Sequence, residues 1–237
     1  MKAKHVGIVA CSAEGAALCY TTLCVEASVM MGHHDHPEVS MHTHSLAHYM
    51  NYIDAGNWQG VADLMLSSTK KLARTGVEFF ICPDNTLHQA LPLVRPHSPL
   101  PWLHIAEEVA AEASRRGFHQ IGILGTRYLV NSEVYPEKLT ERGLAYTRPG
   151  EPEREQINRI IFDELVYGRF ENHALSYFQA VIEALKRQGC DAVVLGCTEI
   201  PLLVNDSNSP LPTLDSTRLL ARAALRYALG DNVALHT

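Results

Sequence analysis

The sequence predicts an α/β protein of two pseudo-symmetric lobes, each with a parallel sheet flanked by helices, and an active site in the cleft between them. Three observations support this. Short apolar segments alternate with helical patterns, the second half of the chain repeats the first, and polar side chains follow corresponding segments in both halves. Ligands of open parallel sheets bind beyond the carboxyl ends of the strands, so these polar side chains are candidates for the site.

Apolar segments bounded by glycine, proline or polar turns read as buried parallel strands. They cover residues 6–10, 39–44, 77–81, 121–124 and 192–195. Helical patterns cover residues 16–31, 58–74, 105–116, 154–166, 176–188 and 216–229. Gly76, Gly117 and Gly189 stand where helix C-caps are expected. Strand–helix alternation of this kind predicts right-handed crossovers between parallel strands.

The repeat is visible as three pairs of segments that match in order along the chain. The offsets are 115, 113 and 111 residues, for 5–10 with 120–125, 72–76 with 185–189, and 98–101 with 209–212. A smooth change of offset is expected of a duplicated lobe with small insertions. We therefore predict a first lobe of residues 1–102 and 211–237 and a second lobe of residues 103–210, because the last strand and helix have no other place to pack.

Composition and charge exclude several function classes. The net charge is −6 and the pI about 6.1, which argues against a nucleic-acid partner, since such proteins normally carry a basic surface. The apolar run near the N-terminus is far shorter than the ~20 residues of a membrane span, so we expect no membrane partner and no signal peptide. The six cysteines lack Cys-x-x-Cys spacing, which predicts reduced thiols and a cytoplasmic location.

The candidate catalytic residues follow the third strand of each half. At the offset of 113 residues, Asp84 is the counterpart of Cys197. Asn85, Thr86 and Thr198 offer amide and hydroxyl groups beside them, which are suited to bind a carboxylate. Backbone N–H groups in such a turn also lower the pKa of a thiol, as a catalytic Cys197 needs. The alternative for Cys197 is an inert buried thiol at a strand end.

The turns after the first strand of each half supply further candidates for substrate binding. Cys11 and Ser12 follow the strand of residues 6–10, and Thr126 follows that of residues 121–124. At the offset of 115 residues Thr126 is the counterpart of Cys11, which favours substrate binding or packing over catalysis for Cys11.

Two motifs resemble those of a known family. Gly-Cys-Thr-Glu-Ile-Pro-Leu-Leu at 196–203 and Asn-Thr-Leu-His at 85–88 are similar to the second-half and first-half motifs of the aspartate/glutamate racemases, in the Asp/Glu/hydantoin racemase superfamily. Residues 124–128 and 157–165 also resemble family segments. The resemblance implies a homodimeric isomerase that racemises aspartate, glutamate or a related acidic amino acid without pyridoxal phosphate or metal. It also implies Cys197 as one of two thiols that flank the substrate.

The sequence departs from this family at two places. Asp84 stands where the first catalytic cysteine is expected, and Ala10-Cys11-Ser12 replaces a Gly-Gly-Met turn near the substrate. Some acidic amino-acid racemases carry threonine at the first position, so we predict a racemase with Cys197 and Asp84 as the acid/base pair. The alternative is a one-thiol member, such as a decarboxylase or cis–trans isomerase of small dicarboxylic acids. Asp84 would then be a turn or N-cap residue.

Histidines are dense between His33 and His48. Imidazole groups bind zinc, copper and nickel, so a metal site is one interpretation. The other is a solvated loop followed by a strand end, which we prefer because the spacing matches no distinctive ligand pattern. We therefore expect no metal, and the resemblance implies that no cofactor is needed.

Overall fold

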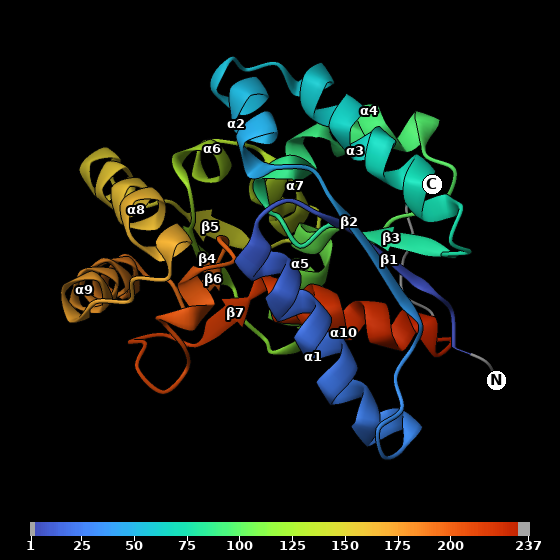
Figure 1. Ribbon diagram of the computed structural model, residues 1–237. Helices are drawn as coiled ribbons and strands as arrows, with labels where there is room; N and C mark the ends of the chain where they lie inside the picture. Colours follow the sequence, from blue (N-terminus) through green and yellow to red (C-terminus); the bar gives the residue numbers. More distant parts are fainter. Residues whose placement is uncertain (1–2, 232–237) are drawn as a thin grey trace. The chain divides into compact units, whose positions relative to one another are not determined.

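The computed structural model describes residues 3–231 as an α/β fold with two parallel sheets flanked by helices, which confirms the predicted fold class (Figure 1). The chain forms two compact units. Unit 1 runs to Glu108 and resumes at Thr217, and unit 2 is Val109–Ser216. Among the described residues, no helix is both long and apolar enough to cross a membrane.

Unit 1 contains a three-stranded sheet with the order β2-β1-β3. Its strands are β1 (Val6–Ala10), β2 (Val39–Thr43) and β3 (Phe79–Ile81). Its helices are α1 (Ala13–Met31), α2 (Leu46–Asp54), α3 (Trp58–Ala73), α4 (Leu91–Val94) and α5 (Ile105–Arg115), which crosses the unit boundary. The last helix, α10 (Ser216–Ala228), also packs here. Alternate residues of β1 and β3 pack with α1 and α10 in one apolar core, while α3 lies on the other face of the sheet (Figure 1).

Unit 2 contains a four-stranded sheet with the order β5-β4-β6-β7. Its strands are β4 (Gln120–Leu124), β5 (Ala145–Thr147), β6 (Ala192–Leu195) and β7 (Thr213–Asp215). Its helices are α6 (Arg127–Val130), α7 (Val134–Thr140), α8 (Glu151–Asp163) and α9 (Asn172–Arg187). Side chains of α8 and α9 form an apolar core with β4 and β6.

The register of the two sheets repeats as the sequence predicts. Ile8 pairs with Ile81 in sheet 1, and Ile123 pairs with Val194 in sheet 2, which preserves the offsets of 115 and 113 residues. The same register makes Asp84 and Cys197 equivalent positions. A parallel bridge between Phe80 and Trp102 in unit 1 corresponds to the pairing of Val193 with Thr213 in unit 2. The fourth strand of the repeat is therefore reduced to a single bridge in unit 1.

The unit boundaries fall later than the predicted boundaries at residues 102 and 210. The strand β7 forms hydrogen bonds with β6 and so belongs to the second sheet, not to the first lobe. Among the described residues, it is the helix α10 that returns to unit 1, where Lys4 N donates to Ala228 O at 2.9 Å and Tyr227 packs against Phe79. An apolar segment of three residues does not reveal which sheet it joins, because that depends on distant partners.

The bounds of most elements agree with the sequence patterns to within a few residues, and β1 and β6 have the predicted bounds. Gly76, Gly117 and Gly189 all have positive φ, at 86°, 73° and 95°, as expected of residues that end helices. The sequence patterns missed the helices α2, α4, α6 and α7 and the strand β5. They are short, and β5 is an edge strand with two exposed residues, so its apolar pattern is weak.

Candidate active site

Backbone contacts with β4 hold the loop that carries Cys197. Gly196 N donates to Leu124 O at 2.8 Å. A Cβ atom at Gly196 would lie 2.5 Å from the same carbonyl oxygen, so only glycine permits this close approach. Ile200 N then donates to Cys197 O at 3.2 Å and closes the turn. Close packing against Leu124 thus explains why residue 196 is glycine. It does not explain Cys197, whose role depends on its side chain.

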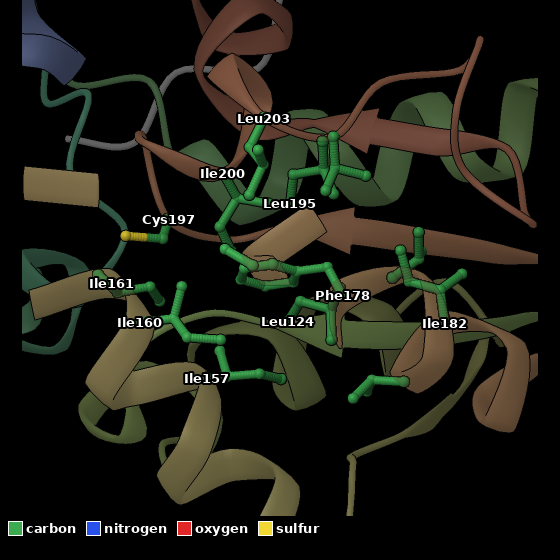
Figure 2. Close-up of a cluster of buried hydrophobic side chains, with 14 of the residues drawn as sticks. Leu124, Ile157, Ile160, Ile161, Phe178, Ile182, Leu195, Cys197, Ile200 and Leu203 are labelled. Atoms are coloured by element: carbon green, nitrogen blue, oxygen red, sulfur yellow. The ribbon is translucent and has the colours of Figure 1, made fainter. Parts of the chain in front are cut away.

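The Cys197 side chain lies at the edge of the apolar core of unit 2, with its sulfur turned away from Phe178 (Figure 2). It is 9% exposed. Its Sγ donates to Glu199 Oε2 at 2.9 Å, and Thr198 Oγ1 donates to the same oxygen at 2.9 Å. Glu199 is itself buried, with 2% exposure. This cluster of thiol, hydroxyl and carboxylate is the main chemical feature at the end of β6.

Thr126 follows β4, the strand next to β6, and is the N-cap of α6. Its Oγ1 accepts a hydrogen bond from Leu129 N at 3.3 Å. The two loops touch, since a Cβ atom at Gly125 would lie 3.1 Å from Gly196 O. The structure therefore brings together the candidates of unit 2, which are Thr126, Cys197 and Thr198.

Hydrogen bonds between side chains and backbone atoms stabilise the loop that carries Asp84. Asp84 Oδ1 accepts from Leu87 N at 3.0 Å, the hydrogen bond of a capping residue, and Asp84 O accepts from His88 Nδ1 at 2.8 Å. His88 Nε2 in turn accepts from Ile105 N at 3.2 Å. One ring nitrogen donates and the other accepts, so His88 is neutral. Burial lowers the pKa of His88 to about 4, which keeps it neutral near pH 7.

Cys82 is the thiol closest in sequence to Asp84, and it is unsuited to act as a base. Burial, reinforced by Asp84, raises the pKa of Cys82 well above its usual value. The thiol is fully buried and points its Sγ toward Asp84 O at 3.9 Å. Asp84 remains the candidate acid/base group of unit 1.

The remaining candidates of unit 1 lie in the loops after β1 and β3, which are adjacent parallel strands. Cys11 and Asn85 are buried and Thr86 is partly buried. Ser12 is the N-cap of α1, and its Oγ accepts from Gly15 N at 3.2 Å. Ser12 and Thr126 therefore have the same capping role, although the repeat offset pairs Thr126 with Cys11. The offset between the two units is thus 115 residues in β1 and β4 but 114 at the caps, Ser12 and Thr126.

Sequence reasoning missed Tyr49, on α2. Its ring is fully buried and meets that of His44 edge-on, with centroids 6.5 Å apart. Burial raises the pKa of Tyr49 most, and the nearby Cys82 and Cys11 raise it further, which places the phenol near the carboxyl ends of β1 and β3. The spacing of its two buried residues, Tyr49 and Ile53, at i and i+4 was the signal that could have revealed this helix.

Two histidines, His42 in β2 and His44 directly after it, form hydrogen bonds with side chains of α3. His42 forms hydrogen bonds with Ser68 Oγ at 3.0 Å and Lys71 Nζ at 2.9 Å, and His44 with Ser67 Oγ at 3.2 Å. Burial, with Lys71 as the second cause, lowers the pKa of both imidazoles. In the described part of the chain no three histidine, cysteine, aspartate or glutamate side chains gather as a metal site.

Comparison with known proteins identifies the family. The model of the Asp/Glu/hydantoin racemases matches residues 8–224. The chain belongs to this family. The family is cofactor-independent, and this chain is a racemase-family enzyme.

Individual relatives agree with this assignment. The broad specificity amino-acid racemase RacX of Bacillus subtilis is 24% identical over 68% of this chain and 69% of its own length. A glutamate racemase of Thermus thermophilus is 30% identical, but over 65% of this chain and 57% of its own length. A solved Yersinia pestis structure proposed to be an Asp/Glu racemase is 30% identical, with a TM-score of 0.87 over 95% of this chain and 99% of that one. An aspartate racemase homologue of Pyrococcus horikoshii is 26% identical, with a TM-score of 0.82 over 97% and 100%.

Proposed function

We propose that this enzyme racemises an acidic amino acid, namely aspartate, glutamate or a close analogue, with Cys197 and Asp84 as the acid/base pair. The observation that carries the proposal is the equivalence of the two loops. The sheet registers put Asp84 at the position of Cys197 in the repeat, within a family of cofactor-independent racemases.

The proposed chemistry needs one proton acceptor and one proton donor on opposite faces of the α-carbon. One of the two groups removes the α-proton, and the other delivers a proton to the opposite face of the resulting enolate. Cysteine suits both roles because its usual pKa of about 8.5 is close to neutrality. Aspartate, at about 3.9, is the weaker base, so the two directions are expected to run at unequal rates.

Hydrogen-bond donors stabilise the negative charge that develops on the substrate carboxylate during proton removal. We propose Asn85, Thr86, Ser12 and Cys11 in unit 1 and Thr126 and Thr198 in unit 2 as substrate-binding residues. They all lie at the carboxyl ends of the strands, where open parallel sheets bind ligands. The Tyr49 hydroxyl is a further candidate donor.

One observation favours a second candidate function. Asp84 Oδ1 caps the turn at Leu87 N, which is a sufficient structural reason for an aspartate at this position. If Asp84 only caps, Cys197 is left as the single acid/base group. The enzyme would then suit a reaction with one proton delivery, such as decarboxylation of a substituted malonate or cis–trans isomerisation of a small dicarboxylic acid.

One experiment separates these functions. The enzyme is incubated with aspartate, glutamate, related amino acids and substituted malonates in deuterated water, and proton NMR and optical rotation are followed. We expect loss of the α-proton signal together with loss of optical activity for an acidic amino acid. Release of carbon dioxide from a malonate, with no exchange in amino acids, would instead establish the lyase. Because the proposed chemistry uses no metal, dialysis against EDTA is expected to leave the rate unchanged.

We also propose that the enzyme is a cytoplasmic homodimer. The six free cysteines accord with a reducing compartment. The helix α1 carries exposed apolar side chains, including Val25 at 64% and Val29 at 88% exposure, and such side chains gather at interfaces. Light scattering after size exclusion tests the dimer, and a monomeric mass at micromolar concentration would contradict it.

A further inference from the structure

Glu199 is a buried carboxylate whose hydrogen bonds go to the side chains of the two preceding residues. It is 2% exposed, and Cys197 Sγ and Thr198 Oγ1 each lie 2.9 Å from Oε2. Within residues 3–231, no lysine, arginine or histidine forms an ion pair with it. Burying a carboxylate without a cation is costly even when neutral donors offset part of the cost. A glutamate at this position therefore requires an explanation.

The Glu199 carboxylate is not needed to hold the local backbone in place. The turn is closed by Ile200 N donating to Cys197 O at 3.2 Å and by Leu202 N donating to Glu199 O at 3.1 Å. Neither bond involves the Glu199 carboxylate, which accepts no backbone N–H from the described residues. What the carboxylate does orient is the thiol of Cys197 and the hydroxyl of Thr198. Its contacts are thus with the candidate catalytic groups of the loop.

We propose that Glu199 is a positioning residue that exchanges a proton with the Cys197 thiol during turnover. As Sγ takes the α-proton of the substrate, the original thiol proton moves to Glu199 Oε2, and the electron pair of the broken C–H bond stays on the enolate. In the reverse direction Sγ gives its proton to the α-carbon and regains one from Glu199. Cys197 can then act as a base without being ionised beforehand. This inference rests on the proposed function.

The test is Glu199→Gln, which keeps the size of the side chain and an acceptor oxygen but has no carboxylate to take a proton. We expect kcat at pH 7 to fall at least about a hundredfold, the scale of a lost proton-transfer group, with KM little changed. Activity should recover partly as the pH rises, because the thiolate then forms without Glu199. The control, Glu141→Gln, removes an exposed charge of the same unit that pairs with Lys138, and should behave like wild type. A wild-type kcat and pH profile for Glu199→Gln would overturn the proposal.

A second readout does not depend on the substrate. Iodoacetamide alkylates the thiolate of Cys197, and peptide mass spectrometry follows the rate against pH. A carboxylate that takes the thiol proton makes the sulfur more nucleophilic, so Glu199→Gln should react several times more slowly than wild type at pH 7. Unchanged alkylation would refute the link between Glu199 and the thiol. If wild type exchanges no α-proton with any substrate, the proposed function fails, and the alkylation rates still decide whether Glu199 controls the thiol.

Thermal unfolding checks that the Gln variant is folded. If the Gln variant is not folded, Glu199→Asp tests the same proposal, because aspartate keeps the charge but moves the carboxylate away from Sγ by one methylene group. A reduced kcat, with recovery at high pH, supports proton exchange over the Sγ–Oε2 distance. A wild-type kcat in a folded Asp variant contradicts it.

Discussion

The two loops that carry Asp84 and Cys197 occupy the same position in the repeat but are stabilised differently. In unit 1 the Asp84 carboxylate binds a backbone N–H, and His88 ties the loop to Ile105. In unit 2 the backbone bonds from Ile200 N to Cys197 O and from Leu202 N to Glu199 O close the turn, and the Cys197 thiol donates to the Glu199 carboxylate. Side-chain hydrogen bonds to the backbone therefore stabilise the first loop, whereas the bond between Cys197 and Glu199 in the second loop joins two side chains.

This difference teaches that equivalence in a repeat does not imply equal chemical roles. The register of the sheets makes the positions of Asp84 and Cys197 equivalent. The immediate partners of each side chain differ, and those partners decide whether a group can move a proton. The comparison predicts a large effect on turnover from the loop of unit 2 and a larger effect on stability from the loop of unit 1.

The largest expected effect is that of Cys197→Ala. Loss of a general acid/base group lowers turnover by at least about a hundredfold, while folding stays near normal because Cys197 lies at the edge of its core. Turnover is measured with the substrate found by exchange, and the midpoint of urea unfolding reports stability. Iodoacetamide should also inactivate the wild type, with protection by substrate. Full activity in the alanine variant would remove Cys197 from the mechanism.

Asp84→Asn distinguishes a proton shuttle from a cap. Asparagine is nearly isosteric and caps about as well as aspartate, but it cannot carry the proton. If Asp84 is the second acid/base group, we expect inversion to be abolished while Cys197 still permits some exchange with retention, as measured by NMR and optical rotation. The companion variant Asp84→Cys restores the thiol pair and is expected to retain racemisation. Inversion at the wild-type rate in Asp84→Asn would mean that Asp84 acts only as a capping residue.

The stability contributed by His88 should depend on pH. The pKa of His88 is lowered by burial to about 4, whereas the unfolded chain has a value near 6.5. The unfolded state therefore binds the proton first, and stability is lost as the pH falls from about 6.5 to about 4. The loss is about 3 kcal/mol for this one group. Urea unfolding of wild type and His88→Gln at both ends of this range checks the result, since the Gln variant should lack this part of the pH dependence.

The smallest expected effect concerns the two helix caps, Ser12 and Thr126. Each accepts a hydrogen bond from a backbone N–H in the first turn of its helix, and its replacement by alanine should cost about 1 kcal/mol. Ser12→Ala and Thr126→Ala are compared by thermal unfolding and by KM. Equal losses of stability with unchanged KM would mean that both are only caps. A raised KM in either variant would support its proposed role in substrate binding.

Much of the fold followed from local patterns. The strands of residues 6–10 and 192–195 were predicted with their observed bounds, because a fully buried parallel strand is a continuous apolar run. The strands β5 and β7 were missed or misplaced because three residues carry too little pattern. For the candidate site, sequence placed Cys197 and Asp84 at strand ends. It did not reveal the capping bond of Asp84, the Glu199 contact with Cys197, or Tyr49.

The sequence by itself determined the duplication, the strand–helix alternation and the polar residues at the strand ends. Each of these follows from periodicity or spacing along the chain. The tertiary structure decided which sheet received β7 and which groups surround each candidate acid/base residue. Those outcomes depend on side-chain rotamers and on partners distant in sequence, as with His88 and Ile105, or Gly196 and Leu124. No local pattern encodes such contacts, because both partners are placed only when the core packs.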